Sequence, residues 1–465
     1  MTEFIQRLEK WDTWEITCPG RTDKNPFVDY EIQGTFTGDH ECKTVDGFYD
    51  GDGNYVVRFM PSFEGNYKFL IYGSFSDKTW EGTFEVLPAS GSNHGPVHVA
   101  NTFHFAYEDG APYYSIGTTC YVWELQSEDL QKQTLETLKK SAFNKIRFCI
   151  LPKHYDYNLN EPISYPYIGT PCDSTKLTSD NFMQFNGRAE GNQWDYSRFN
   201  PDHFRHIEQC IRQLRDLSIE ADLIVMHPYD RWGFSLMNRE QDEQYWSYRK
   251  DQYNHLRSIH NCRAFYDYSR PWITHCSIQR QDVYKTAEYV DEWRERYQKP
   301  VVLDEIAYEG NIQHGWGNIS GKELVRRFWE ASLRGGYAGH GETYMNPKDI
   351  LWWSHGGVLH GESPDRLKFL YQILSETPGY GLTPLKQAWD EVCATAEHVS
   401  YYLYYYGFNR PSFREFYFDD TIEFDVEVID TWDMVIENRG IFKGRFKVEL
   451  PGKEYMAIRI RKHQA

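Results

Sequence analysis

Carboxylate, imidazole and indole side chains gather in a few short stretches of this sequence. The densest of these stretches are HPYDRW (227–232), LDEIAYE (303–309) and GHGE (339–342). Cleavage of a glycosidic bond needs one carboxylate as nucleophile or base and a second carboxyl group as acid, roughly 5 Å or 6.5–9.5 Å apart. Because burying such groups together is costly unless they are paired, the stretches predict a functional site.

Asp304 and Glu305 compete for the first of these two roles. Residues 301, 303 and 305 share one face of a strand, whereas Asp304 shares the other face with Val302. This alternation predicts that only one of the two carboxylates points into the protein, and it does not say which. A purely structural interpretation also stays open, in which Glu305 pairs with a nearby arginine and takes no part in chemistry.

Tryptophans and histidines offer further candidates. Four tryptophans lie in or beside predicted strand ends, where an indole can stack on a sugar ring, although the core is the more usual place for any one of them: Trp123, Trp232, Trp352 and Trp353. Metal binding is a competing interpretation of the histidines. His255 and His260 lie on opposite faces of a predicted strand, and His340 with Glu342 supplies fewer ligands than a catalytic site needs. We therefore expect no metal and no other cofactor.

The elements that must position these residues alternate between strand and helix. Strand patterns cover 114–123, 144–151, 221–230, 255–261, 272–279, 300–309 and 339–345. Amphipathic helices are predicted at 127–143, 202–217, 282–297, 322–336 and 366–378. No glycine-rich nucleotide-binding motif follows a strand, so this α/β pattern favours a (β/α)8-type TIM barrel. In such a barrel the active site lies at the carboxyl ends of the strands, where the polar stretches fall.

Two β-rich regions flank the predicted barrel. Segments between Trp11 and Leu87 alternate strand-forming and polar residues, which predicts an N-terminal Ig-like β-sandwich over 1–90. The linker-like stretch PASGSNHGP (88–96) precedes a barrel domain at 97–383. Alternation returns in a C-terminal antiparallel β-sandwich domain at 384–465. The exposed sandwich faces on both flanks leave room for a homo-oligomer.

Composition excludes several classes of partner. The formal net charge of -18 argues against nucleic acid, whose binding requires lysine and arginine to replace condensed counterions. The first residues lack a signal-peptide pattern, and no later run approaches the roughly 20 apolar residues of a membrane span. Nine cysteines without a C-x-x-C pair indicate reduced thiols. We expect a cytoplasmic protein that binds neither membrane nor nucleic acid.

Several of these stretches together resemble a known family. HPYDRWGF, HLRSIHN, WITHCSIQ, PVVLDEIAYEG and GHGETYM with the following ILWWSHGG are similar to a bacterial family of glycoside hydrolases whose barrels look apiosidase-like or cellulase-like. The resemblance implies that Glu305 is the catalytic carboxylate and that Arg147 keeps it ionised. It also implies that a sugar-binding subsite is lined by His227, Asp230, His275, Tyr308, His340 and Glu342. His154 and Glu309, which lie beyond the ends of the second and seventh strands, are further substrate-binding candidates from their position alone.

The sequence departs from this family at one point. Related barrels carry another strand, ending in a second carboxylate, between the third strand and HLRSIHN, and here only seven strands are predicted where eight close a barrel. Asp230 and Glu342 are the expected substitutes for the missing acid. The resulting hypothesis is a glycoside hydrolase acting on oligosaccharides or glycosides. The alternative is a carbohydrate-binding pseudoenzyme that has lost its general acid.

Overall fold

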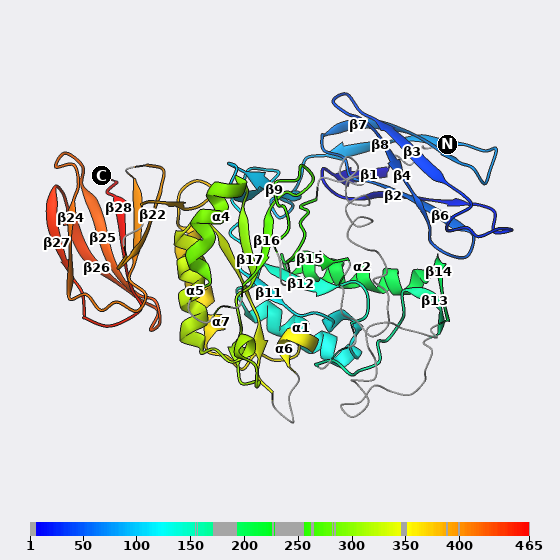
Figure 1. The fold of residues 1–465 in the computed structure, drawn as a ribbon. Helices are drawn as coiled ribbons and strands as arrows, with labels where there is room; N and C mark the ends of the chain where they lie inside the picture. Colours follow the sequence, from blue (N-terminus) through cyan, green and yellow to red (C-terminus); the bar gives the residue numbers. More distant parts are fainter. Residues whose placement is uncertain are drawn as a thin grey trace.

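The protein consists of a central α/β unit with a β-rich unit on either side of it (Figure 1). The computed structural model describes residues 6–153, 155, 157–170, 193–225, 227, 255–261, 265–280, 282, 285–345, 351–386, 389–398 and 400–464. Among the helices of these residues, none has the length and apolar character needed to cross a bilayer.

The N-terminal unit is built from two mostly antiparallel sheets that enclose an aromatic core. One sheet has the order β1 (Gln6–Glu9), β8 (Trp80–Leu87), β7 (Gly65–Gly73), β3 (Ile32–Thr37) and β4 (Cys42–Asp46). The other has the order β2 (Trp14–Pro19), β6 (Asn54–Phe59) and β5 (Phe48–Tyr49). Inward-facing residues alternate with polar ones along the strands, so that Trp14 stacks on Phe84 with ring centroids 5.2 Å apart.

The central unit holds a parallel sheet curved like half a barrel. Its order is β15 (Glu220–Ile224), β12 (Lys145–Cys149), β11 (Gly117–Thr119), β19 (Tyr337–His340), β17 (Val301–Glu305) and β16 (Cys276–Gln279). The predicted parallel α/β arrangement is thus confirmed for six strands, while a closed eight-stranded barrel stays a prediction. The predicted strand at 255–261 is reduced to one parallel bridge, between His260 and Ser277.

Most of the helices pack on the outer face of this sheet, whereas α6 (Trp352–His355) and η4 (Gly315–Gly317) lie at the carboxyl ends of its strands. The other helices are α1 (Glu128–Lys140), α2 (Pro201–Asp216), α4 (Val290–Tyr297), α5 (Gly321–Leu333) and α7 (Ser363–Ser375), with single turns η1 (Trp123–Leu125) and η3 (Ala287–Tyr289). Local sequence sets where they start. The Ser320 hydroxyl caps α5 by accepting from the amide of Glu323, and Asn200 caps α2 ahead of Pro201.

Short strand pairs complete the central unit. They are β9 (Val97–Ala100) with β10 (His104–Tyr107), β13 (Tyr167–Thr170) with β14 (Gln193–Phe199), and β18 (Glu309–Gly310) with β20 (Glu342–Thr343). The first pair lies at the amino ends of the sheet strands, because Phe105 packs with Val302 and Tyr337. It therefore closes the end of the sheet opposite to the carboxyl ends.

The C-terminal unit has an apolar core of its own and shares a second one with the central unit. Its larger sheet has the order β21 (Thr383–Pro384), β22 (Val392–Ala396), β23 (Tyr401–Tyr405), β28 (Met456–Lys462), β25 (Phe424–Asp430) and β26 (Val435–Phe442), and β24 (Phe413–Tyr417) pairs with β27 (Arg445–Glu449). Trp329 of α5 stacks on Tyr405 with centroids 5.4 Å apart. One continuous apolar cluster includes Leu303 of β17 and Leu403 of β23, so α5 lies between two sheets and is buried along most of its length.

Candidate active site at the carboxyl end of strand β17

Glu305, the last residue of β17, is a buried carboxylate with two hydrogen-bond donors and an imidazole nitrogen around one oxygen. Its Oε1 accepts from the hydroxyl of Tyr121 at 2.6 Å and from Nη1 of Arg147 at 3.0 Å. Nε2 of His260 lies 3.3 Å from the same atom. Burial raises the pKa of Glu305, but the groups around Oε1, His260 foremost, outweigh burial and hold the pKa well below its usual range. Glu305 is therefore ionised at neutral pH.

The neighbouring Asp304 also points to the inside of the sheet, which corrects the prediction that only one of the two acids can do so. Asp304 accepts from Nζ of Lys145 at 3.0 Å, and Lys145 and Arg147 lie two residues apart on the same face of β12. The register between β16 and β17 shifts between Ser277 and Gln279, so β17 carries one extra residue there. Such a bulge breaks the alternation on which the prediction rested.

Asp304 belongs to a network of ion pairs that extends over neighbouring strands. Its Oδ2 accepts from the hydroxyl of Ser277, and Lys145, which binds its Oδ1, also donates to Asp222 of β15 at 2.7 Å. Burial raises the pKa of Asp304, but the positive charges of Lys145 and Arg147 hold that pKa well below its usual range. Anionic and cationic side chains from three strands, β15, β12 and β17, therefore alternate next to Glu305.

His260 belongs to segment 255–261, which is attached to β16 by side-chain hydrogen bonds. The Ser258 hydroxyl donates to the carbonyl of His275 at 2.6 Å, and the Asn261 carboxamide oxygen accepts from the amide of Gln279 at 2.9 Å. These bonds replace the ladder of a regular strand and lay 255–261 beside β16. Nδ1 of His260 then lies 3.0 Å from the Ser277 hydroxyl.

Aromatic rings form a wall beside Glu305. Tyr121, whose hydroxyl binds Glu305, has its ring 5.0 Å from the indole of Trp353, and Trp353 is 4.9 Å from Trp316 of η4. Tyr308 lies 6.0 Å from the same indole. Trp316 is half-buried, whereas Trp353 and Tyr308 are buried. Flat apolar rings next to a carboxylate suit the C–H faces of a sugar.

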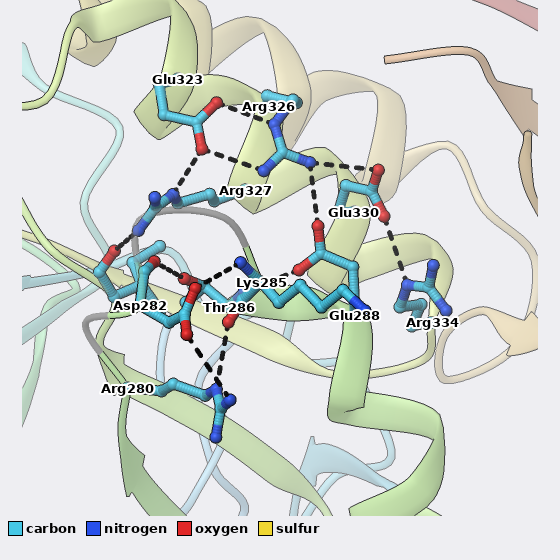
Figure 2. A network of polar contacts seen from close by, with 11 residues as sticks. Arg280, Asp282, Lys285, Thr286, Glu288, Glu323, Arg326, Arg327, Glu330 and Arg334 are labelled. Atoms are coloured by element: carbon cyan, nitrogen blue, oxygen red, sulfur yellow. Dashed lines mark hydrogen bonds and ion pairs between the residues drawn. The ribbon is translucent and has the colours of Figure 1, made fainter. Parts of the chain in front are cut away.

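The backbone behind Glu305 is anchored by α5. Nη1 of Arg327 donates to the carbonyl of Ile306, and its Nε donates to Glu323 at 2.7 Å. Figure 2 shows Arg327 at one end of a row of ion pairs that continues along α5 through Arg326, Glu330 and Arg334. The anchor matters because Ala307 has a φ of 65°, a left-handed conformation that is strained for a residue with a Cβ.

Several predicted residues lie away from Glu305. Trp123 and Trp352 belong to the main core between sheet and helices, and the Trp352 indole donates to the Thr118 hydroxyl at 3.0 Å. His340 is in the same layer, with Nδ1 2.8 Å from the Thr118 hydroxyl, and burial lowers its pKa to about 3. His275 precedes β16 and packs on Phe105 at the amino end of the sheet, so the prediction that it lines a pocket at the carboxyl ends is corrected.

Glu309 and Glu342 form a second carboxylate pair. Glu309 accepts from the amides of Glu362 and Ser363 at 2.7 and 3.0 Å, at the start of α7. Glu342 accepts from the amides of residues 360 and 361 at 2.5 and 2.7 Å. Burial, together with the charge of Glu309, raises the pKa of Glu342 to about 7. Within the described residues, no hydrogen bond or ion pair joins this pair to Glu305.

His227 lies near the site, and three candidates lie outside the described residues: His154, Asp230 and Trp232. Burial and the charge of Lys153 lower the pKa of His227 far below its usual range. The Lys153 ammonium lies 4.9 Å from the centroid of the Tyr121 ring. The sequence analysis missed Tyr121 and Lys153, although Tyr121 follows β11 and Lys153 follows β12, so the strand-end rule could have found both.

Comparison with known proteins found two matching domain families and several similar solved structures. Two domains of unknown function match, DUF5060 over residues 7–73 and DUF5605 over 389–461. A candidate glycoside hydrolase from Bacteroides vulgatus ATCC 8482 is 33% identical in sequence, with 98% of this chain and 100% of that chain covered and a TM-score of 0.87. A search of curated proteins gave no match.

More distant structures share the fold alone. A family 5 glycoside hydrolase from the same organism is 15% identical, with 79% of this chain and 94% of that chain covered and a TM-score of 0.56. Another glycoside hydrolase is also 15% identical, with 79% and 97% covered and a TM-score of 0.55.

Proposed function

The chain belongs to the same family as the candidate glycoside hydrolase of Bacteroides vulgatus, and we propose that it hydrolyses glycosidic bonds with Glu305 as its catalytic carboxylate. The substrate class is oligosaccharides or simple glycosides. The proposal rests above all on the environment of Glu305, since a carboxylate that is buried, ionised and beside an aromatic wall is what an oxocarbenium-like transition state requires.

The unequal oxygens of Glu305 support a role as nucleophile. The side chains of Tyr121, Arg147 and His260 all contact Oε1, and within the described residues no hydrogen bond reaches Oε2. A carboxylate held by one oxygen presents the other in a defined direction. Oε2 is therefore the atom that we expect to attack the anomeric carbon.

The leaving oxygen needs a proton from a second group. Glu342 has a pKa of about 7, which suits an acid, but both of its oxygens accept backbone amides of residues 360 and 361, just before α7. We therefore favour Asp230, which follows β15 in the chain, as the acid. If Asp230 fills this role, the Asp230→Asn variant retains much of its rate on nitrophenyl glycosides, whose leaving groups need little protonation.

A panel of nitrophenyl glycosides, furanosides included, tests the proposal. We expect Glu305→Gln to lower turnover by at least ~10³-fold, as loss of a principal catalytic group does. Glu295→Gln makes the same chemical change on the exposed surface of α4 and serves as the matched control. Equal turnover in Glu305→Gln and wild type would refute Glu305 as the nucleophile.

The same panel separates the enzyme from a carbohydrate-binding pseudoenzyme. Calorimetry with oligosaccharides run beside a product assay measures binding and turnover on one sample. Binding without product from any substrate supports the pseudoenzyme, whereas product formation that is lost in Glu305→Gln supports the hydrolase.

A further inference from the structure

A line of hydrogen-bonding groups runs from Asp304 to Glu305 through two other elements. The Ser277 hydroxyl of β16 bonds Asp304, Nδ1 of His260 lies 3.0 Å from that hydroxyl, and Nε2 of His260 lies 3.3 Å from Oε1 of Glu305. Ser277 and His260 are also the two residues of the parallel bridge between β16 and 255–261. The backbone pairing therefore brings the two side chains together.

The chemistry of each group fixes the direction of the hydrogen bonds. Asp304 is ionised because Lys145 and Arg147 hold its pKa well below the usual range, so it can only accept. The Ser277 hydroxyl therefore donates to Asp304 and offers its lone pairs to His260. Nδ1 of His260 must then carry a hydrogen. A neutral His260 in this tautomer would turn the bare lone pair of Nε2 toward the carboxylate of Glu305, which is repulsive.

The charges nearest to His260 favour the same protonation state. The buried carboxylates Asp304 and Glu305 lie at the two ends of the hydrogen-bonded line, and an anion 3.3 Å from Nε2 favours a protonated ring. Lys145, Arg147 and Lys153 lie in the same region, and Asp222, which binds Lys145, is one-third exposed. His275 is not a further cation there, because burial outweighs the charges of Asp304 and Asp222 and lowers its pKa to about 4.

We propose that Asp304 and Ser277 hold His260 as an imidazolium, and that this imidazolium is a positioning residue for the nucleophile Glu305. It binds Oε1 together with Arg147 and so directs Oε2 at the anomeric carbon. His260 keeps its proton through the catalytic cycle. The hydrogen bond from its Nε2 to Oε1 of Glu305 weakens while Oε2 is bonded to the sugar, and it is restored when the carboxylate is released. The inference rests on the proposed function, because it assigns a role toward Glu305 as nucleophile.

Nitrogen NMR of histidine-labelled protein tests the protonation state without any substrate. The His260→Asn spectrum identifies the signals of His260 by their loss. We expect both ring nitrogens of His260 to carry hydrogen at pH 7 in the wild-type protein. A neutral ring at pH 7, in either tautomer, would overturn the proposal, and the protonation state itself is read on the wild-type protein.

We call the hydrogen-bonded line of Asp304, Ser277 and His260 the relay. Variants of Ser277 and Asp304 test its effect on turnover. Ser277→Ala and Asp304→Asn each remove a partner of the imidazolium, so the His260 ring should lose its proton at a lower pH than in the wild-type protein. The nitrophenyl glycoside that is cleaved fastest serves as substrate. The alkaline limb of the kcat–pH profile should shift to lower pH together with the His260 titration, with KM changed less than twofold. Ser277→Thr keeps the hydroxyl and should restore the wild-type profile.

The two proposals fail in different ways. If Glu305→Gln is inactive while Ser277→Ala has the wild-type His260 titration and pH profile, the relay is wrong and the nucleophile assignment stands. If Glu305→Gln is fully active, the nucleophile assignment is wrong, and the inferred role of His260 in catalysis is wrong with it.

Discussion

Two adjacent indoles, Trp352 and Trp353, lie in different surroundings. Trp352 is in the main core with its nitrogen bonded to Thr118, whereas Trp353 joins Tyr121 in the aromatic wall beside Glu305. Consecutive residues of the short helix α6 point in different directions. The sequence marks both as candidate platforms because the pattern of a single helical turn is too short to show which face is inward.

This difference predicts separate effects of two alanine substitutions. Trp353→Ala should weaken binding of a cleaved oligosaccharide by about 1–3 kcal/mol, the range of aromatic stacking contacts. Trp352→Ala should instead lower the free energy of unfolding by about 3–5 kcal/mol, as loss of a buried aromatic does. Calorimetric titration and urea unfolding of both variants give the two values. Unchanged affinity in Trp353→Ala would place that indole outside the binding site.

Glu342 predicts a dependence of stability on pH. Its pKa is about 7 in the folded protein against an ordinary value of 4.5, so the folded state holds a proton that the unfolded state has lost. The free energy of unfolding should therefore fall as the pH rises from about 4.5 to 7, by an amount on the order of 1–3 kcal/mol.

Glu342→Gln removes this titrating group. Urea unfolding of wild type and Glu342→Gln at several pH values should give a difference that changes between pH 4.5 and 7 and is constant above it. A difference that is constant across this range would show that Glu342 does not titrate there.

At the scale of elements, the sequence predicts the strands with continuous apolar runs and misses irregular geometry. β12, β16 and β17 fall within predicted ranges, and β15 begins one residue before its range, because each strand includes apolar residues of a short predicted run. The extra residue of β17 has no signature in the sequence, so the inward turn of Glu305 beside Asp304 could not be predicted. Segment 255–261 alternates like a strand, but Ser258 and Asn261 bind β16 through side chains.

Helix α5 should affect chemistry through the backbone of β17. Arg327→Met removes the donor to the Ile306 carbonyl and leaves Glu323 paired with Arg326. We expect a loss of stability of about 3–5 kcal/mol, typical of breaking a buried ion pair, and a lower kcat, because Ile306 directly follows Glu305. Lys322→Met, at an exposed position of the same helix, is the control. Stability and kcat both equal to wild type would show that the anchor is not needed.

At the scale of the whole molecule, the three units are not equally independent. The N-terminal unit has an aromatic core of its own, and ion pairs such as that between Arg58 and Glu208 of α2 join it to the rest. The C-terminal unit also has a core of its own, but the main core runs from the central sheet through α5 into its strands. Sequence patterns show a change of period near residue 384 but cannot show that the apolar faces on either side meet.

Calorimetry should therefore resolve two unfolding transitions. We expect the smaller one to report the N-terminal unit and the larger one to report the central and C-terminal units together. Trp14→Ala should lower only the first midpoint, and Trp329→Ala only the second, because each indole belongs to one core. Separate melting of the C-terminal unit, ahead of the central unit, would contradict a shared core.

The shared core also sets an order of events during synthesis on the ribosome. Leu333 ends α5, and β23, one of the strands that pack on α5, extends to Tyr405, 72 residues later in the chain. At ordinary elongation rates this interval takes on the order of ten seconds. During that time the N-terminal unit can already be folded, while the apolar side of α5 waits for the strands that cover it. This interval is when the nascent chain most needs a chaperone.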